Sequence, residues 1–216
     1  MTDAQASSTI LAKLKNARTL GDVYAIDFPH VVGPINDVDA FTDLPDFTPR
    51  VYGRAEKDAV IWDREPSPAV REATSLIDAF EASAGHTVPQ RWDMDVIRAQ
   101  NVANTSIICS LHMDGPHEPR MRVYFAASEK PTWVVPHAAI RDILRENAGH
   151  ILYHPIDGGY LESLQMASQN LEDHFRRAAR RVPANTLMVM SGVTFHFRDQ
   201  SVSHQRAFVR ARGFNA

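Results

Sequence analysis

Apolar residues recur at helical spacing in four segments of the chain. The clearest segment covers residues 66–85, where Ser67 can cap the amino-terminal end and Gly85 follows the carboxyl-terminal end. Three further helices are predicted at 8–18, at 137–147 and near 160–181. Residues 28–50 hold several proline and aspartate residues and are expected to form a structured surface loop.

Segments rich in β-branched and apolar residues occupy the middle and the end of the chain, where they predict β-strands. These strands are predicted at 58–62, 105–114, 121–128, 132–135, 150–154, 186–190, 193–197 and 206–214. Helices in front, antiparallel strands behind and a helical insertion between the strands favour an α+β fold around a sheet or barrel.

The length of 216 residues fits a single domain, 1–216, whose core is large enough to need no disulfide. Within this domain we expect residues 1–104 to be mostly helical. The strands of residues 105–135 and 183–214 are expected to form the core of the fold. Residues 137–182 are then a mainly helical insertion into that core.

Composition and charge narrow the class of protein. The hydrophobic share of 44% and the charged share of 23% are ordinary for a soluble globular protein. A formal net charge of −3 does not favour nucleic acid or a membrane surface as a partner. Cys109 is the only cysteine and cannot form an internal disulfide, and neither a signal peptide nor a membrane span is recognisable. We therefore expect a soluble, cytoplasmic protein.

Two possible metal ligands lie at the end of the strand predicted at 105–114. His112 and Asp114 belong to the segment LHMDGPH, and residues two apart in a strand project from the same face. An isolated His-x-Asp is common by chance. It indicates a metal site only if a third ligand lies elsewhere in the chain.

The third ligand is predicted near the end of the chain. There a strand, a Ser191-Gly192 turn and a short apolar run lead to His196, and Arg206 opens the next strand ten residues later. Two imidazoles and one carboxylate form a facial triad, which leaves three positions on ferrous iron open for substrate and oxygen. An arginine one strand beyond the second histidine suits bidentate binding of a carboxylate.

This order of residues resembles that of the Fe(II)- and 2-oxoglutarate-dependent oxygenases, whose core is a double-stranded β-helix (a jelly-roll or cupin-like fold). Their pattern is H-x-D, a gap, a second histidine and an arginine about ten residues later, and TLMVMSGVTFH is similar to their strand-turn-strand approach to the second histidine. The resemblance implies that His112, Asp114 and His196 bind iron. It also implies that Arg206 binds the distal carboxylate of the cosubstrate 2-oxoglutarate, with help from Tyr124 as in some members.

Two of these assignments have rivals in the sequence. His204 lies only eight residues beyond His196, which we prefer because the preceding glycine turn and the ten-residue gap to Arg206 match the family pattern. Arg210 lies four positions beyond Arg206, on the same strand face, and is a rival for the carboxylate.

The resemblance covers residues 105–135 and 183–214 and implies an oxygenase that uses O2 to hydroxylate or otherwise oxidise a C–H bond. A small-molecule substrate such as an amino acid or related metabolite suits a chain of this length. Halogenating relatives have a small residue in place of the carboxylate ligand, so Asp114 favours hydroxylation. A looser similarity links the chain to an uncharacterised bacterial family of domains of unknown function, which implies no activity.

Other interpretations fit the same residues. A cupin-like protein could bind a metal through the triad as a sensor or metal-binding module, without oxidising a substrate. A metal-free β-barrel could bind a small carboxylate. Taken singly, His196 is typical of a buried core histidine and Arg206 of a solvated charge on an edge strand, so the metal site depends on the whole set.

Overall fold

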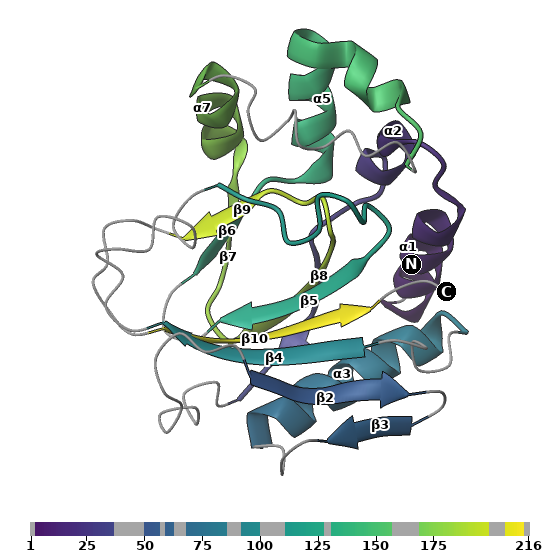
Figure 1. Ribbon diagram of the computed structural model, residues 1–216, viewed down its shortest axis with the longest axis vertical. Helices are drawn as coiled ribbons and strands as arrows, with labels where there is room; N and C mark the ends of the chain where they lie inside the picture. Colours follow the sequence, from purple (N-terminus) through teal and green to yellow (C-terminus); the bar gives the residue numbers. More distant parts are fainter. Residues whose placement is uncertain are drawn as a thin grey trace.

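The protein is described from a computed structural model, in which two antiparallel β-sheets carry helices on their outer surfaces (Figure 1). The described residues are 3–36, 50–56, 59–62, 68–85, 92–99, 111–127, 131–156, 169–198 and 206–213. The helices are α1 (Asp3–Asn16), α2 (Leu20–Tyr24), α3 (Pro68–Ser83), α5 (His137–Ala148), the short 3₁₀ helix η3 (Gly149–Tyr153) and α7 (Gln169–Ala178). The strands are β1 (His30–Pro34), β2 (Arg50–Glu56), β3 (Ala59–Trp62), β4 (Trp92–Ala99), β5 (Arg122–Ala127), β6 (Thr132–Val134), β7 (Arg180–Val182), β8 (Thr186–Ser191), β9 (His196–Arg198) and β10 (Arg206–Gly213). No described helix has the length and apolar character needed to cross a membrane.

The chain passes back and forth between the two sheets. The larger sheet has seven strands in the order β1-β8-β5-β10-β4-β2-β3, and the smaller has three in the order β7-β6-β9. From β5 onward the path runs from the large sheet to β6 and β7, back to β8, across to β9, and back again to β10. A further antiparallel bridge joins His112 to His196, so the segment before Asp114 lies beside β9 at the edge of the smaller sheet.

Apolar side chains fill the space between the sheets. This inner cluster takes residues from β5 and β8 of the large sheet and from β6 and β7 of the small one. Its members are Met121, Val123, Phe125, Ala127, Val134, Val182, Met188 and Met190. Burying each larger side chain contributes about 1.5–3 kcal/mol to folding, so the two sheets are held face to face.

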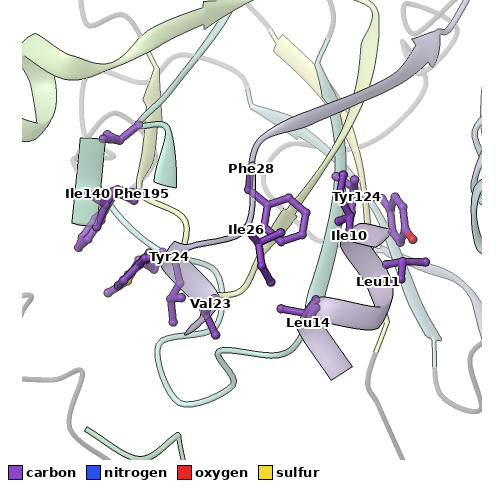
Figure 2. Packing of buried hydrophobic residues seen from close by; sticks show 14 of the residues in the cluster. Ile10, Leu11, Leu14, Val23, Tyr24, Ile26, Phe28, Tyr124, Ile140 and Phe195 are labelled. Atoms are coloured by element: carbon purple, nitrogen blue, oxygen red, sulfur yellow. Dashed lines mark hydrogen bonds between the residues drawn. The ribbon is translucent and has the colours of Figure 1, made fainter. Parts of the chain in front are cut away.

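A second apolar cluster lies between the outer face of the large sheet and the helices. Successive residues of a strand point to opposite faces, so Val123 and Phe125 of β5 belong to the inner cluster whereas Tyr124 and Ala126 belong to the outer one. Figure 2 shows Tyr124 close to the apolar side chains of α1. This outer cluster fixes the helices against the sheet and leaves the inner face to the candidate site.

An ion pair buried in this outer layer joins α3 to β5. The Nε atom of Arg122 lies 2.6 Å from Oε1 of Glu81, and the two side chains are 3% and 1% exposed. The hydroxyl of Tyr124 donates a hydrogen bond to the same carboxylate oxygen. Burial first, and then the charge of Glu81, raise the pKa of Tyr124 well above its ordinary value, so its hydroxyl stays protonated and can donate.

A second buried polar residue joins α5 to α2. His137, at the start of α5, packs between the rings of Tyr24 and Phe28, each with its centroid 5.1 Å away. Its Nδ1 lies 2.9 Å from the carbonyl oxygen of Val23. Burial lowers the pKa of His137 to about 4, so the imidazole is neutral near pH 7. The Nδ1 proton is therefore the one donated to Val23.

Among the described residues, the structure confirms the α+β class and most of the predicted elements, with several differences; residues 105–110 and 160–168 of two predicted elements lie outside the described residues. The expected loop at 28–50 contains strand β1, which pairs with β8. The expected strand at 150–154 is instead the 3₁₀ helix η3. Its adjacent residues Ile151 and Leu152 are both buried while Tyr153 is 81% exposed, and the alternation of a strand would not give this pattern. Residues 1–104 contribute four strands to the large sheet as well as three helices, so the sheet uses more of the chain than expected.

Replacing Glu81 with alanine should lower the free energy of unfolding by about 3–5 kcal/mol, because it leaves the guanidinium of Arg122 buried without its carboxylate. Urea denaturation followed by circular dichroism measures the change. The matched control is Glu172→Ala in α7, whose ion pair with Arg176 is partly exposed and should contribute less than about 1 kcal/mol. Equal losses in the two variants would contradict the role assigned to the buried pair.

Acidification should destabilise the fold through His137. Its pKa is about 4 in the folded state against 6.5 unperturbed, so between these values the unfolded chain binds the proton that the folded chain excludes. His137→Asn keeps a donor for Val23 but cannot titrate. Between about pH 7 and about pH 5 the wild type should therefore lose about 2 kcal/mol more stability than the variant. Urea denaturation at both pH values measures the difference, and identical pH dependence would contradict the assignment.

Candidate metal centre

Three possible metal ligands meet at the junction of the two sheets. His112, Asp114 and His196 each offer one ligand atom, and these atoms all lie within 4.8 Å of one another. The backbones of the two histidines exchange hydrogen bonds, with N–O distances of 3.1 Å from His112 to His196 and 3.0 Å in return. Their imidazole rings have centroids 4.2 Å apart. Within the described part of the chain, this is the only cluster of histidine, cysteine, aspartate or glutamate side chains that could hold a metal ion.

Two glycines let the segments that carry the ligands approach each other closely. Gly115 follows Asp114, and its N–H donates to the carbonyl of Gly192 at 2.8 Å. Gly192 in turn donates to the carbonyl of Met121 at 2.8 Å. A Cβ on Gly192 would lie 2.5 Å from the carbonyl oxygen of Glu118, so a larger residue would push the turn away from the loop.

The hydrogen bond of His196 orients its ring for metal binding. Its Nδ1 lies 3.1 Å from the carbonyl oxygen of Thr194, which can only accept, so Nδ1 carries the proton. The other nitrogen, Nε2, faces Oδ2 of Asp114 at 3.7 Å. The lone pair of Nε2 is therefore directed at the point where the three ligands meet.

The two carboxylate oxygens of Asp114 have different surroundings. Oδ1 accepts a hydrogen bond from Nη1 of Arg210 at 2.9 Å. Oδ2 is buried and has no hydrogen-bond partner among the described residues. A buried carboxylate oxygen without a donor is unfavourable unless a cation binds it, so this atom fits the metal site.

Charge around Asp114 keeps its carboxyl group ionised. Burial alone would raise the pKa of Asp114, but His196, Arg210 and His112 together hold it below its ordinary value. A metal ligand must be deprotonated, and this carboxyl group meets that condition at neutral pH. Two imidazoles and a carboxylate can therefore bind a divalent transition metal and leave coordination positions open.

The other predicted site residues lie in different places. Arg206 opens β10, where its backbone pairs with that of Ala99 in β4. His204 lies outside the described residues, as does Cys109. Tyr124 was predicted beside the cosubstrate, but the structure places it on the outer face of β5, bonded to Glu81.

Strand alternation explains the error about Tyr124. Val123 and Phe125 occupy the inner face of β5, and the ring of Phe125 lies 6.0 Å from that of His196. A residue between them must face the helices.

The contact of Arg210 with Asp114 was not predicted, although the sequence had named Arg210 as a rival for a carboxylate. In β10 it pairs with Phe125, which sets it on the inner face.

Comparison with solved structures finds proteins with a similar fold. The chain is similar to the non-heme alpha ketoglutarate dependent epimerase SnoN from nogalamycin biosynthesis, with 16% identity, a TM-score of 0.50, and coverage of 95% of this chain and 84% of SnoN. Weaker matches are EvdMO1 (11% identity, TM-score 0.44, 96% of this chain and 50% of EvdMO1) and the Kdo hydroxylase KdoO, a non-heme Fe(II) alphaketoglutarate dependent dioxygenase (12% identity, TM-score 0.34, 76% of this chain and 70% of KdoO). No protein-family model and no curated protein matches the sequence.

Metal binding should depend on His196 and not on His204. His196→Ala removes one of three ligands, so we expect loss of Co(II) uptake, measured by anaerobic titration and visible absorption. His204→Ala is the matched control and should bind Co(II) as the wild type does. The opposite result, with binding lost only in His204→Ala, would show that the second histidine ligand had been assigned to the wrong residue.

Proposed function

We propose that this protein is an Fe(II)- and 2-oxoglutarate-dependent oxygenase that hydroxylates, or otherwise oxidises, a C–H bond of a small-molecule substrate. The observation that carries the proposal is the triad of His112, Asp114 and His196, with the buried Oδ2 of Asp114 directed at the meeting point of the ligands. The similarity of the fold to SnoN supports it, because that protein is a non-heme alpha ketoglutarate dependent enzyme.

The path of the chain supports a double-stranded β-helix as the core of this fold. The large sheet contributes β4, β10, β5 and β8 as neighbours, and the small sheet contributes the His112 segment, β9, β6 and β7. From β5 onward the chain crosses repeatedly between two face-to-face sheets, as in a jelly roll. The triad then lies where the inner faces of the two sheets meet.

Each protein group has a defined task in the proposed reaction. His112, Asp114 and His196 would hold the Fe(II), which supplies the oxidation of the C–H bond by O2 when 2-oxoglutarate is bound. The inner cluster, which includes Phe125 next to His196, forms an apolar wall that keeps water from this side of the centre. Because Asp114 occupies the third ligand position, hydroxylation is favoured over halogenation.

The two arginines of β10 are proposed to have different tasks. Arg210 bonds Oδ1 of Asp114 and so turns Oδ2 toward the histidines, which makes it an outer partner of a metal ligand. Arg206 opens the same strand, four residues before Arg210. We assign it to the distal carboxylate of 2-oxoglutarate, because guanidinium binds carboxylate through paired hydrogen bonds.

An anaerobic titration tests the proposed function. Purified protein is mixed with Fe(II), with 2-oxoglutarate, and with both. A weak visible charge-transfer band that appears only when both are present is the expected result, and His196→Ala should not produce it. Metal uptake without the band would instead indicate a cupin-like metal-binding protein. No metal uptake would overturn both interpretations.

Substitution of the two arginines separates their tasks. Arg206→Ala should raise the 2-oxoglutarate concentration needed for half of the band by roughly tenfold or more, because it removes a charge-assisted contact, and should leave Fe(II) affinity almost unchanged. Arg210→Ala should weaken Fe(II) binding more than 2-oxoglutarate binding. The reverse pattern would show that Arg210 is the carboxylate anchor.

A further inference from the structure

A chain of buried hydrogen bonds connects His196 to helix α5. The carbonyl of Thr194 accepts from Nδ1 of His196 at 3.1 Å. The hydroxyl of the same threonine lies 2.7 Å from Nε2 of His137, at the start of α5. His137, Thr194 and His196 are 0%, 1% and 4% exposed, so water does not compete for these bonds. One side chain therefore separates a buried imidazole in the helical insertion from a metal ligand.

The direction of each bond in this chain can be assigned. Nδ1 of His137 donates to the carbonyl of Val23, so in the neutral imidazole Nε2 has a lone pair and can only accept. Two hydroxyls face Nε2, that of Thr194 at 2.7 Å and that of Ser191 at 3.3 Å, and the shorter contact makes Thr194 the main donor. The same hydroxyl oxygen accepts the backbone N–H of Ser191 at 3.1 Å. Its donor and acceptor roles are both used, which fixes its rotamer.

We propose that His137 is a positioning residue of the metal centre, acting through Thr194 to hold the carbonyl that orients the imidazole of His196. The proposal rests on the proposed metal site. In this arrangement α5 holds the turn that leads into β9, and Nε2 of His196 faces Asp114. The helical insertion thereby takes part in the centre although it supplies no ligand.

A purely structural role for His137 explains its buried hydrogen bonds less well. An apolar side chain would fill the space between Tyr24 and Phe28 without the cost of burying an imidazole. The bond to Val23 ties α5 to α2, but it uses only Nδ1. The shorter of the two contacts at Nε2 reaches Thr194, whose carbonyl accepts from Nδ1 of His196. Groups that orient a ligating histidine typically change metal affinity by about 10–100-fold when they are removed.

Two pairs of substitutions separate positioning from packing. In His137→Asn the amide can occupy the place of Nδ1 and keep the bond to Val23, but it does not reach Thr194. In His137→Gln the longer side chain can place an amide oxygen near the position of Nε2 and accept from Thr194. Thr194→Val keeps the shape of the side chain without its hydroxyl, whereas Thr194→Ser keeps the hydroxyl.

Anaerobic Co(II) titration of the full chain tests the proposal without substrate or 2-oxoglutarate. Affinity comes from the titration, the geometry of the centre from the visible absorption bands, and stability from thermal melting of the metal-free protein. Titrations are run below the melting range of every variant, so each affinity refers to folded protein. We expect His137→Asn and Thr194→Val to bind Co(II) about tenfold or more weakly with shifted bands, and His137→Gln and Thr194→Ser to stay within about threefold of wild type.

The other outcomes overturn the proposal in distinguishable ways. Wild-type affinity and bands in His137→Asn and Thr194→Val, even with lower melting temperatures, would show that the two residues act only on folding. Equal weakening in Thr194→Val and Thr194→Ser would show that the hydroxyl is not the cause. Absence of Co(II) binding in the wild type would overturn the metal site itself, and the positioning role with it.

Discussion

The candidate site depends on one pair of backbone hydrogen bonds, those that His112 and His196 exchange. Without this bridge, the two histidines would be held together only through side chains. With it, the segment before Asp114 becomes a neighbour of β9, and both imidazoles project from adjacent positions of one sheet. The close contact of Gly115 with Gly192 extends the same pairing into the loops beyond it. The backbone therefore sets the ligand spacing before the side chains or a metal contribute.

The large sheet packs against the small sheet, at whose edge the bridge lies. β5 has an inner face that packs against the small sheet and an outer face that is anchored to α3 by Glu81, Arg122 and Tyr124. The outer face of β5 carries the buried charges, which are costly unless they are paired. The inner face of β5 carries apolar residues next to the ligands. This separation keeps competing carboxylates away from the triad.

The sequence predicted those parts of the site that depend on local order. His112 and Asp114 are two apart, so their shared face follows from strand geometry alone, and His196 was added from the family pattern of a glycine turn before the second histidine. The prediction for Tyr124 was wrong because it needed the strand register. Whether this side chain faces the site depends on which residues of β5 oppose β8 and β10, and tertiary packing sets that register. The same register brings Arg210 to Asp114.

Strand β1 and helix η3 were missed because short segments take their conformation from the elements they pack on.

The two ligands with described outer contacts are oriented by different parts of the fold. Arg210 of β10 binds one oxygen of Asp114 and leaves the other directed inward, while the carbonyl of Thr194 holds the Nδ1 proton of His196 and leaves Nε2 directed inward. Each contact uses the atom of the ligand that the metal does not need. Both contacts belong to the fold itself, so the cost of ordering these two ligands is met during folding. Oδ2 of Asp114 is buried with no hydrogen-bond donor among the described residues, and a bound cation would compensate its charge.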